Sequence, residues 1–290
     1  VYKRQELYDF VLNGMHYGKP TDDKNSGNYK YIHGGKNPKT GKEWLPSNIT
    51  YGLKNKSKDE LVKSQKDNYA YGNGNATYAC DIGVGNCTDA ITIALKACDV
   101  GLGDEVLTTS NTAVPTVTAI VNTGASVKFV DINEYSLIDV KKISSFISEK
   151  TKAIIPVHLY GQMCEMDEIM EIAKKHNLKV IEDCAQSHGA TYKNKKAGSI
   201  GDVGCYSFYP TKIFGAYGDG GFITTNNEKL FDRMRRIRFL GMEKKKMSSG
   251  HWNGKYYAIE HGTNSRLDEV HAAIMLKKLP YLDQWINRRR

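Results

Sequence analysis

Hydrophobic and polar positions follow a regular strand–turn–helix order from residue 81 onward. Short apolar runs of strand length lie at 105–109, 126–130, 153–157, 179–182, 203–209 and 222–225, and helical segments lie at 89–98, 113–122, 140–148, 165–176, 228–240 and 266–279. Apolar strands that alternate with helices are typical of βαβ units and of a parallel sheet buried on both faces. Pro280 is expected to end or kink the last helix. The pattern predicts an α/β fold with three layers (α/β/α) and a mostly parallel sheet.

Residues 1–80 differ from the rest of the chain. They are rich in Lys, Asn, Gly and Tyr, they contain many turn-forming dipeptides, and they show no sustained periodicity. The first residues, VYKRQ, lack an initiator Met and look like a translated adapter sequence. We therefore expect an atypical N-terminal segment over residues 1–80, irregular or artefactual in part.

Composition limits the classes of function. The 290 residues are 40% hydrophobic, which is enough for one large domain or for one domain plus pieces of a second. No apolar run is long enough to span a membrane. No secretory leader opens the chain, so a cytoplasmic location is expected. The six cysteines form no CxxC pair and no metal-ligand spacing, which favours reduced thiols and no metal. The net charge of +9 comes with short basic clusters and no aromatic-interleaved stripe, which argues against nucleic-acid binding and suits a small phosphate-bearing substrate.

Lys212 lies in the most informative segment. The run Ser207–Lys212 (SFYPTK) closes an apolar strand and leads into the glycine-rich turn 215–221 (GAYGDGG). Upstream, the strand 179–182 ends at Asp183, and Gln186 follows three residues later. Pyridoxal phosphate needs a lysine amine as its Schiff-base partner, a carboxylate beside the pyridine nitrogen, and N–H and O–H donors for its phosphate. In open α/β sheets such groups gather at the carboxyl ends of the strands.

Two elements are candidates for the phosphate. The hydroxyl of Ser207 lies near the end of its strand, and residues 85–89 (GNCTD) open a helix, where free N–H groups and the helix dipole attract anions. Thr88 would add a hydroxyl there. Each feature has an ordinary alternative, because Asp183 could be a helix cap, Lys212 an exposed loop lysine and Ser207 an edge-strand serine.

From about residue 81 to 290 the chain resembles the DegT/DnrJ/StrS family of sugar aminotransferases. The segments that carry the resemblance are 103–106 (GDEV), 155–162 (IPVHLYGQ), 181–190 (IEDCAQSHGA), 207–221 and 264–269 (NSRLDE), and they occur in the family's order. The resemblance implies the fold-type I architecture of pyridoxal-phosphate-dependent transferases. It further implies a pyridoxal-phosphate-binding large domain over 81–245, and the start of a C-terminal small domain over 246–290 that the chain does not complete.

The resemblance also implies a role for each matched residue. Lys212 would be the catalytic Schiff-base lysine, Asp183 the partner of the pyridine nitrogen, and Gln186 the contact of the ring hydroxyl. The phosphate would be bound by Ser207, Thr88 and the backbone of Cys87, which replaces the family's usual glycine. Asn264 would reach the phosphate of a neighbouring subunit, so the active site would be shared across a homodimer.

The implied reaction moves an amino group from an amino acid, glutamate being the expected donor, to a nucleotide-linked keto-sugar. A related dehydrating branch carries histidine at the lysine position, so Lys212 favours transamination. One departure concerns Ala113, which stands where the family often has an aromatic that stacks on the cofactor.

Two other interpretations remain at this point. The atypical segment 1–80 and the incomplete C-terminal domain are also compatible with a catalytically inactive or regulatory pyridoxal-phosphate-binding protein, or with a fragment of such an enzyme. A dinucleotide-binding oxidoreductase is disfavoured, because no complete G-x-G-x-x-G lies between a strand and a helix.

Overall fold

A seven-stranded sheet organises the part of the chain that the structure describes. The structure is a computed structural model that describes residues 80–242 and 257–289, which belong to one compact unit, Tyr78–Arg290. The expected irregular segment lies outside these residues except for its last one, so that expectation and the proposed domain boundaries stay predictions.

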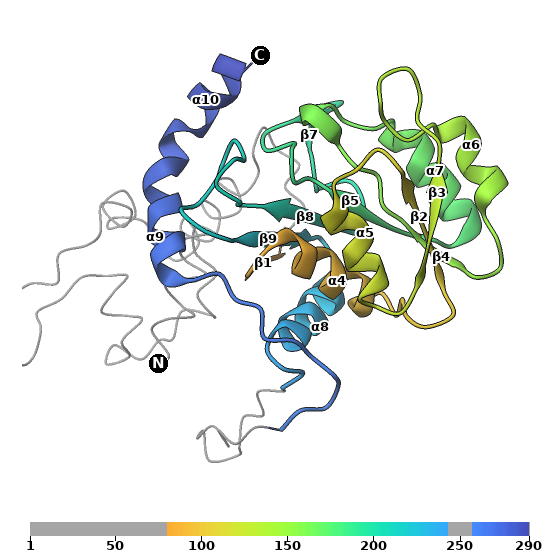
Figure 1. The fold of residues 1–290 in the computed structure, drawn as a ribbon, viewed down its shortest axis with the longest axis horizontal. Helices are drawn as coiled ribbons and strands as arrows, with labels where there is room; N and C mark the ends of the chain where they lie inside the picture. The colour runs from red at the N-terminus through yellow and green to blue at the C-terminus, as the bar shows by residue number, and fades with distance from the viewer. Residues whose placement is uncertain (1–79, 243–256, 290) are drawn as a thin grey trace, which may run out of the picture. The chain divides into compact units, whose positions relative to one another are not determined.

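The sheet has the strand order β1-β9-β8-β5-β4-β2-β3 (Figure 1). In chain order its strands are β1 (Cys80–Val84), β2 (Glu105–Thr109), β3 (Ser126–Val130), β4 (Thr151–Ile154), β5 (Lys179–Asp183), β8 (Val203–Ser207) and β9 (Gly221–Thr225). All pairs between β3 and β8 are parallel, whereas β9 is antiparallel to both of its neighbours, β8 and β1. Six strands therefore point the same way and β9 alone is reversed, which confirms the predicted mostly parallel sheet.

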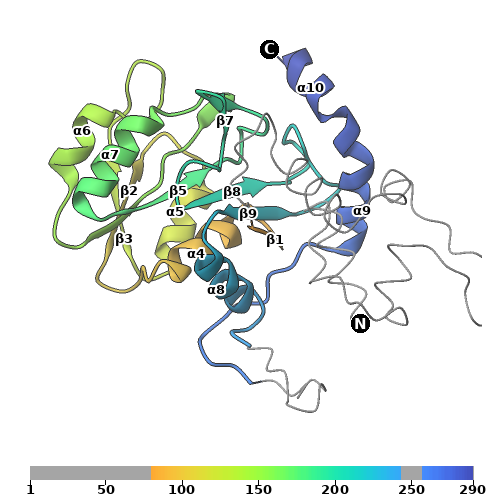
Figure 2. The same cartoon turned by 180° about the vertical axis from the view of Figure 1, so that it is seen from behind.

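Helices cover both faces of this sheet. They are α4 (Cys87–Ala97), α5 (Val114–Val121), α6 (Val140–Phe146), α7 (Met166–His176) and α8 (Glu228–Arg238). The connections β1-α4-β2 and β2-α5-β3 advance along the sheet in one direction, and β3-α6-β4 and β4-α7-β5 return in the other. Because parallel crossovers are right-handed, α4 and α5 share one face and α6 and α7 share the opposite face. Figure 1 shows α4 and α5 together with α8, and Figure 2 shows α6 beside α7. The three-layer prediction is thus confirmed.

The core lies between the sheet and these helices. Strand residues such as Val106, Leu107 and Val180 are fully buried, as are Ile91 and Leu95 of α4. The central parallel strands are buried along almost their whole length, which is why they appear in the sequence as continuous apolar runs.

The last helical segment bends at the predicted proline. Helix α9 (Glu269–Lys278) ends in a short 3-10 turn, Leu279–Tyr281, which contains Pro280 and leads into α10 (Leu282–Arg289). The Lys278 amine donates to the carbonyl of Gly215, so the end of α9 lies against the glycine-rich turn that follows Lys212. A small hairpin, β6 (Thr191–Tyr192) and β7 (Lys195–Lys196), lies apart from the main sheet.

Candidate active site

The ends of four strands meet at one edge of the sheet. Val84 at the end of β1 pairs with Gly221 at the start of β9, and Gly221 pairs with Ser207 at the end of β8. In the next strand, Asp183 pairs with Cys205. The strand register therefore places the predicted Asp183 and Ser207 on the edge from which α4 begins, the edge where ligands bind in open α/β sheets.

The N-terminus of α4 forms a cup of backbone donors. The Asn86 side chain accepts from the amide of Asp89 at 2.8 Å, and the Asn86 carbonyl accepts from the amide of Ala90 at 3.1 Å. The amides of Cys87 and Thr88 precede this first intrahelical bond and have no acceptor within the helix. With the positive end of the helix dipole behind them, they suit an anion.

Strand β9 can approach this cup because it starts with glycine. A Cβ atom on Gly221 would lie 2.4 Å from the carbonyl carbon and oxygen of Asn86 and 2.9 Å from the nitrogen of Cys87. Beside Gly221, the buried hydroxyl of Ser207 accepts from the Tyr209 amide at 3.3 Å, which leaves its hydrogen for another acceptor. Ser207, Gly221 and the α4 amides thus form one continuous surface.

A loop distant in sequence, which contains Ser265, is hydrogen-bonded to the same cup. The hydroxyl of Ser265 accepts from the amide of Gly85 at 2.9 Å and donates to the carboxylate of Asp89 at 2.6 Å. Asn264, the preceding residue, is exposed, and its side-chain oxygen accepts from Arg266 at 2.9 Å. The structure therefore brings the loop of Asn264 to the cup and leaves the Asn264 side chain on the surface.

Asp183 is a buried carboxylate with two donors. Its side chain is 5% exposed; one oxygen accepts from the hydroxyl of Thr116 at 2.7 Å and the other from the amide of Ala185 at 3.0 Å. A second hydroxyl, from Thr112, lies 2.8 Å from that of Thr116. Sequence reasoning missed both threonines, although their i, i+4 spacing across the start of a predicted helix was visible.

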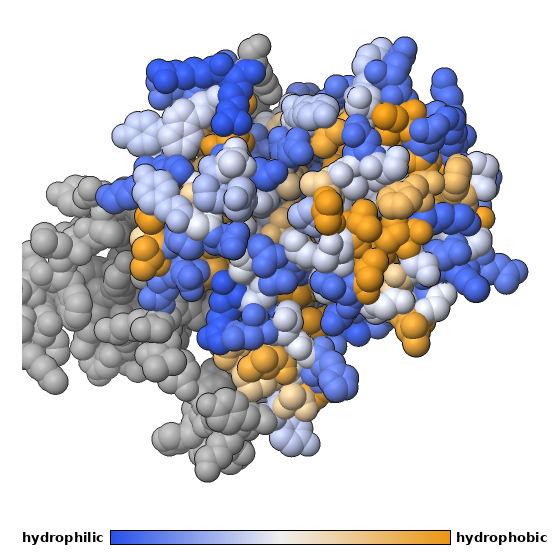
Figure 3. Space-filling view, in the orientation of Figure 1, coloured by the Kyte–Doolittle hydropathy of each residue, from blue (hydrophilic) through white to orange (hydrophobic). Residues whose placement is uncertain are grey.

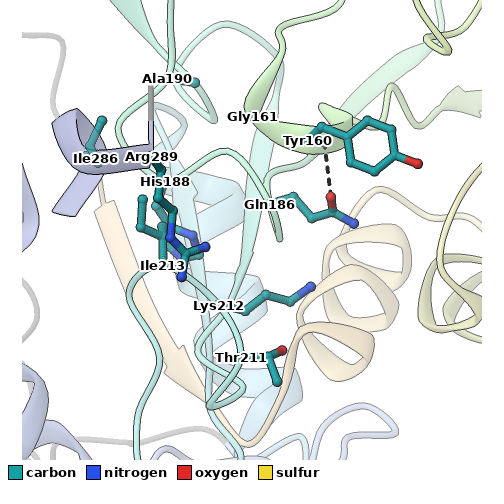
Figure 4. A pocket seen from close by; sticks show the side chains of 10 residues that line it. All are labelled: Tyr160, Gly161, Gln186, His188, Ala190, Thr211, Lys212, Ile213, Ile286 and Arg289. Atoms are coloured by element: carbon teal, nitrogen blue, oxygen red, sulfur yellow. Dashed lines mark hydrogen bonds between the residues drawn. The ribbon is translucent and has the colours of Figure 1, made fainter.

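Lys212 lies beside a cavity of about 490 Å³ that Gln186 and His188 also line (Figure 4). The side-chain oxygen of Gln186 accepts from the Tyr160 amide at 3.0 Å, which leaves the Gln186 amide nitrogen free to donate elsewhere. Ile286 and Arg289 of α10 close the far side of this cavity. The predicted Lys212 and Gln186 therefore line one cavity.

Electrostatic coupling links the cavity to the cup. Burial, followed by the nearby Asp183 carboxylate, raises the pKa of the Cys87 thiol, while the Lys212 ammonium acts in the opposite direction. Burial and the same ammonium lower the pKa of His188 to about 4. Lys212 thus lies within electrostatic range of both the α4 cup and His188, and the thiol and imidazole are neutral at pH 7.

Residues 75–290 match the family model of the DegT/DnrJ/EryC1/StrS aminotransferase family. The chain belongs to this family. That match confirms the resemblance found in the sequence motifs.

Individual relatives of the family agree with this assignment. The chain is 51% identical over 211 residues to the dTDP-3-amino-3,6-dideoxy-alpha-D-galactopyranose transaminase of Aneurinibacillus thermoaerophilus, over 72% of this chain and 55% of that protein. It is 50% identical over 210 residues to the pleiotropic regulatory protein of Geobacillus stearothermophilus, over 72% of this chain and 54% of that one. The chain thus spans about half the length of these curated relatives.

A solved family structure has the same fold. NtdA from Bacillus subtilis with bound cofactor PMP is 36% identical and matches with a TM-score of 0.64, over 78% of this chain and 48% of that chain. With the parallel sheet and its two helical layers, this confirms the fold-type I architecture predicted from the sequence.

Beneath the site of this family member, Glu182 and His158 form a fully buried pair. The His158 Nδ1 accepts from the Cys164 amide at 3.2 Å, so Nε2 carries the proton and donates to Glu182 at 3.0 Å. Glu182 also accepts three amides of the loop 198–201. Cys184 lies close enough to share a metal ion with them, but both nitrogens of His158 are already hydrogen-bonded.

Across residues 80–242 and 257–289, none of the helices has the length and apolar character needed to cross a membrane.

Proposed function

We propose that this chain is the cofactor-binding part of a pyridoxal-phosphate-dependent aminotransferase that acts on a nucleotide-linked keto-sugar, with an amino acid such as glutamate as donor. The observation that carries the proposal is the meeting of Lys212, Asp183 and the α4 cup at one edge of the sheet. A lysine amine, a buried carboxylate and an anion cup are three separate requirements of this cofactor.

The residues present fit the cofactor on structural grounds. The amides of Cys87 and Thr88 lack intrahelical acceptors, and Gly221 keeps the surface beside them open where a Cβ atom would collide with the cup. The carboxylate of Asp183 is buried and held by two donors, as the partner of a protonated ring nitrogen should be. Each donor and acceptor thus has a counterpart on pyridoxal phosphate.

Each site residue then has a role at a stated atom. When bound, pyridoxal phosphate supplies an aldehyde that exchanges amines and a ring that accepts electrons. The Asp183 carboxylate holds the proton at the ring nitrogen, and the Gln186 amide nitrogen donates to the ring hydroxyl.

The remaining residues anchor the cofactor and move protons. The amides of Cys87 and Thr88, with the hydroxyls of Thr88 and Ser207, hold the phosphate. The Nζ of Lys212 would hold the cofactor and would move a proton to and from the substrate carbon.

The substrate class is supported by charge and by similarity. The relative from Aneurinibacillus thermoaerophilus is named for a dTDP-linked amino sugar, and the net charge of +9 of this chain suits a substrate that carries two phosphates. Lys212 supports transamination over the dehydration that a histidine at this position would indicate.

We also propose a homodimer with a shared active site. Asn264 is exposed on a loop that Ser265 fastens to the cup, so its side chain is available to a second subunit. Apolar side chains gather over α5 (Figure 3), where Val114 and Val121 are 75% and 58% exposed. Contiguous exposed apolar residues of this kind mark protein–protein contacts.

The inactive or regulatory alternative has less support. One relative is named as a regulatory protein, but the lysine, the carboxylate, Gln186 and the anion cup are all present and close to one another in this chain.

The test measures which residue binds the cofactor and whether the amino group is transferred. Pyridoxal phosphate is added to the purified chain, reduced with borohydride, and the labelled peptide is identified by mass spectrometry. We expect the label on Lys212, and conversion of bound cofactor by glutamate followed by transfer to a keto-sugar nucleotide. Lys212→Ala should lose turnover almost completely while remaining folded, and Lys195→Ala, an exposed control, should behave as wild type. Substantial turnover by Lys212→Ala would refute the assignment; cofactor binding with no amino transfer in the wild type would favour the inactive alternative.

A further inference from the structure

We infer that Thr116 is a positioning residue for the Asp183 carboxylate and that Thr112 is the next link behind it. The inference rests on the proposed function, in which Asp183 holds the proton at the cofactor's ring nitrogen. It assigns a role to the start of α5 and to the residue before its N-cap, which none of the sequence motifs covers.

The hydrogen bonds form a chain with one direction. An ionised carboxylate only accepts, so the Thr116 hydroxyl donates its single hydrogen to Asp183 across 2.7 Å. The Thr112 and Thr116 hydroxyls are 2.8 Å apart, and since the hydrogen of Thr116 is already used, Thr112 must be the donor between them. The order of donation is therefore Thr112 to Thr116 to Asp183.

Burial makes this chain difficult to replace with water. Thr116 is fully buried and Asp183 is 5% exposed, whereas Thr112 is half-buried at the outer end. A threonine in a first helical turn commonly bonds to its own backbone, but here the hydroxyl crosses from α5 to the end of β5. Loss of the hydroxyl would leave a buried carboxylate oxygen without this donor.

Asp183 has a second hydrogen-bond donor, and comparison with it shows what the Thr116 hydroxyl contributes. The Ala185 amide donates to the other carboxylate oxygen at 3.0 Å and lies two residues after Asp183, just beyond the end of β5. Thr116 is thus the donor that fixes the carboxylate relative to a different element. Donors of this kind stabilise the ionised form of the carboxylate and fix its rotation, both of which keep the proton on the ring nitrogen.

The decisive variant is Thr116→Val, which removes the hydroxyl and keeps the shape. We expect the rate of the glutamate half-reaction to fall by roughly tenfold to a hundredfold, which corresponds to one lost hydrogen bond to a charged group. The KM for glutamate should change by less than about threefold, because glutamate is not predicted to contact Thr116. With ¹⁵N-labelled pyridoxal phosphate bound, the ring ¹⁵N shift should move toward the neutral pyridine value.

Three further variants separate positioning from packing. Thr116→Ser keeps the hydroxyl and should restore the rate and the ¹⁵N shift, and Thr112→Val should give a smaller effect of the same kind. Thr118→Val, at an exposed position of the same helix, is the matched control and should resemble wild type. If Thr116→Val does not fold, Thr112→Val decides, because it removes a hydroxyl that is half-buried.

The outcomes distinguish this inference from the proposed function. A wild-type rate and ¹⁵N shift in Thr116→Val would overturn the positioning role, as would a Thr116→Ser variant as impaired as Thr116→Val. If Asp183→Asn is impaired while Thr116→Val is normal, only the present inference fails. If Asp183→Asn itself behaves as wild type, the proposed role of Asp183 fails and this inference fails with it.

Discussion

Replacing Glu182 by glutamine should destabilise the fold strongly, although the change only exchanges one oxygen for an NH₂ group. One carboxylate oxygen accepts the amides of Ile200 and Gly201 at 2.8 and 2.6 Å, and the other accepts the Gly198 amide at 2.9 Å and His158 Nε2 at 3.0 Å. All four partners are donors, and the Glu182 side chain is fully buried.

The magnitude follows from counting these donors. Whichever way the glutamine amide turns, its NH₂ group faces two donors and loses two hydrogen bonds to a charged acceptor. At about 2 kcal/mol each, the free energy of unfolding should fall by about 4 kcal/mol. His158 cannot compensate by exchanging its proton, because its Nδ1 already accepts from Cys164.

The assay is urea unfolding of the cofactor-free chain, followed by circular dichroism and tryptophan fluorescence. Glu168→Gln is the matched control, because Glu168 is exposed on α7 and should give a change below about 0.5 kcal/mol. A Glu182→Gln variant that loses less than about 1 kcal/mol would show that these four donors do not converge on the carboxylate. The result does not depend on any proposed catalytic role.

Two other predictions address the pH response and the cup. His188 has a pKa of about 4 when folded, against about 6.5 when unfolded, so the unfolded state binds more protons below pH 6.5 and stability falls as the pH drops toward 4. From pH 7 to pH 5 this loss of unfolding free energy is about 2 kcal/mol, so His188→Phe should flatten the pH dependence of urea unfolding by that amount. The exposed control His176→Phe should keep the wild-type pH dependence. The same pH dependence in wild type and His188→Phe would contradict the buried neutral imidazole. Gly221→Ala would force a Cβ atom to within 2.4 Å of the Asn86 carbonyl, and the resulting shift of the cup should weaken pyridoxal phosphate binding by roughly tenfold or more in a titration. Gly101→Ala, whose nearest neighbour would be 3.8 Å away, should bind normally; equal affinities for the two alanine variants would remove Gly221 from the cup.

The central part of the fold could be predicted because its strands are buried on both faces. Glu105–Thr109 and Ser126–Val130 have the predicted bounds, and the predicted strand at 153–157 is found at Thr151–Ile154, since Pro156 has no N–H for the ladder. Strand β1 was not predicted, because its residues CDIGV carry an Asp and a Gly and β9, with which it pairs in the described sheet, is distant in sequence. The two-residue strands of the β6–β7 hairpin are too short to give a periodic signal.

The candidate site could be predicted where local motifs carry it. Asp183, Gln186 and Lys212 follow strand ends in recognisable segments, and the strand register and the shared cavity bring them to one edge of the sheet. The hydrogen bonds that hold the site residues in place were missed, because each joins segments far apart in sequence. Thr116 bonds Asp183 across 67 positions, and Ser265 bonds Gly85 across 180, and no periodic pattern records such contacts.

The reversed strand β9 also sets the order in which the cup can form during synthesis. Among the described residues, strand β1, which leads directly into the cup, pairs only with β9, and its register partners run from Cys80↔Thr225 to Val84↔Gly221. A nascent chain that has not yet extended past Thr225 has α4 but lacks the strand that pairs with β1 in the described sheet. Contacts this distant in sequence slow folding, because the intervening chain must close before they form. The proposed phosphate cup is therefore complete only after β9 has been made, although the α4 amides that would hold the phosphate are synthesised long before it.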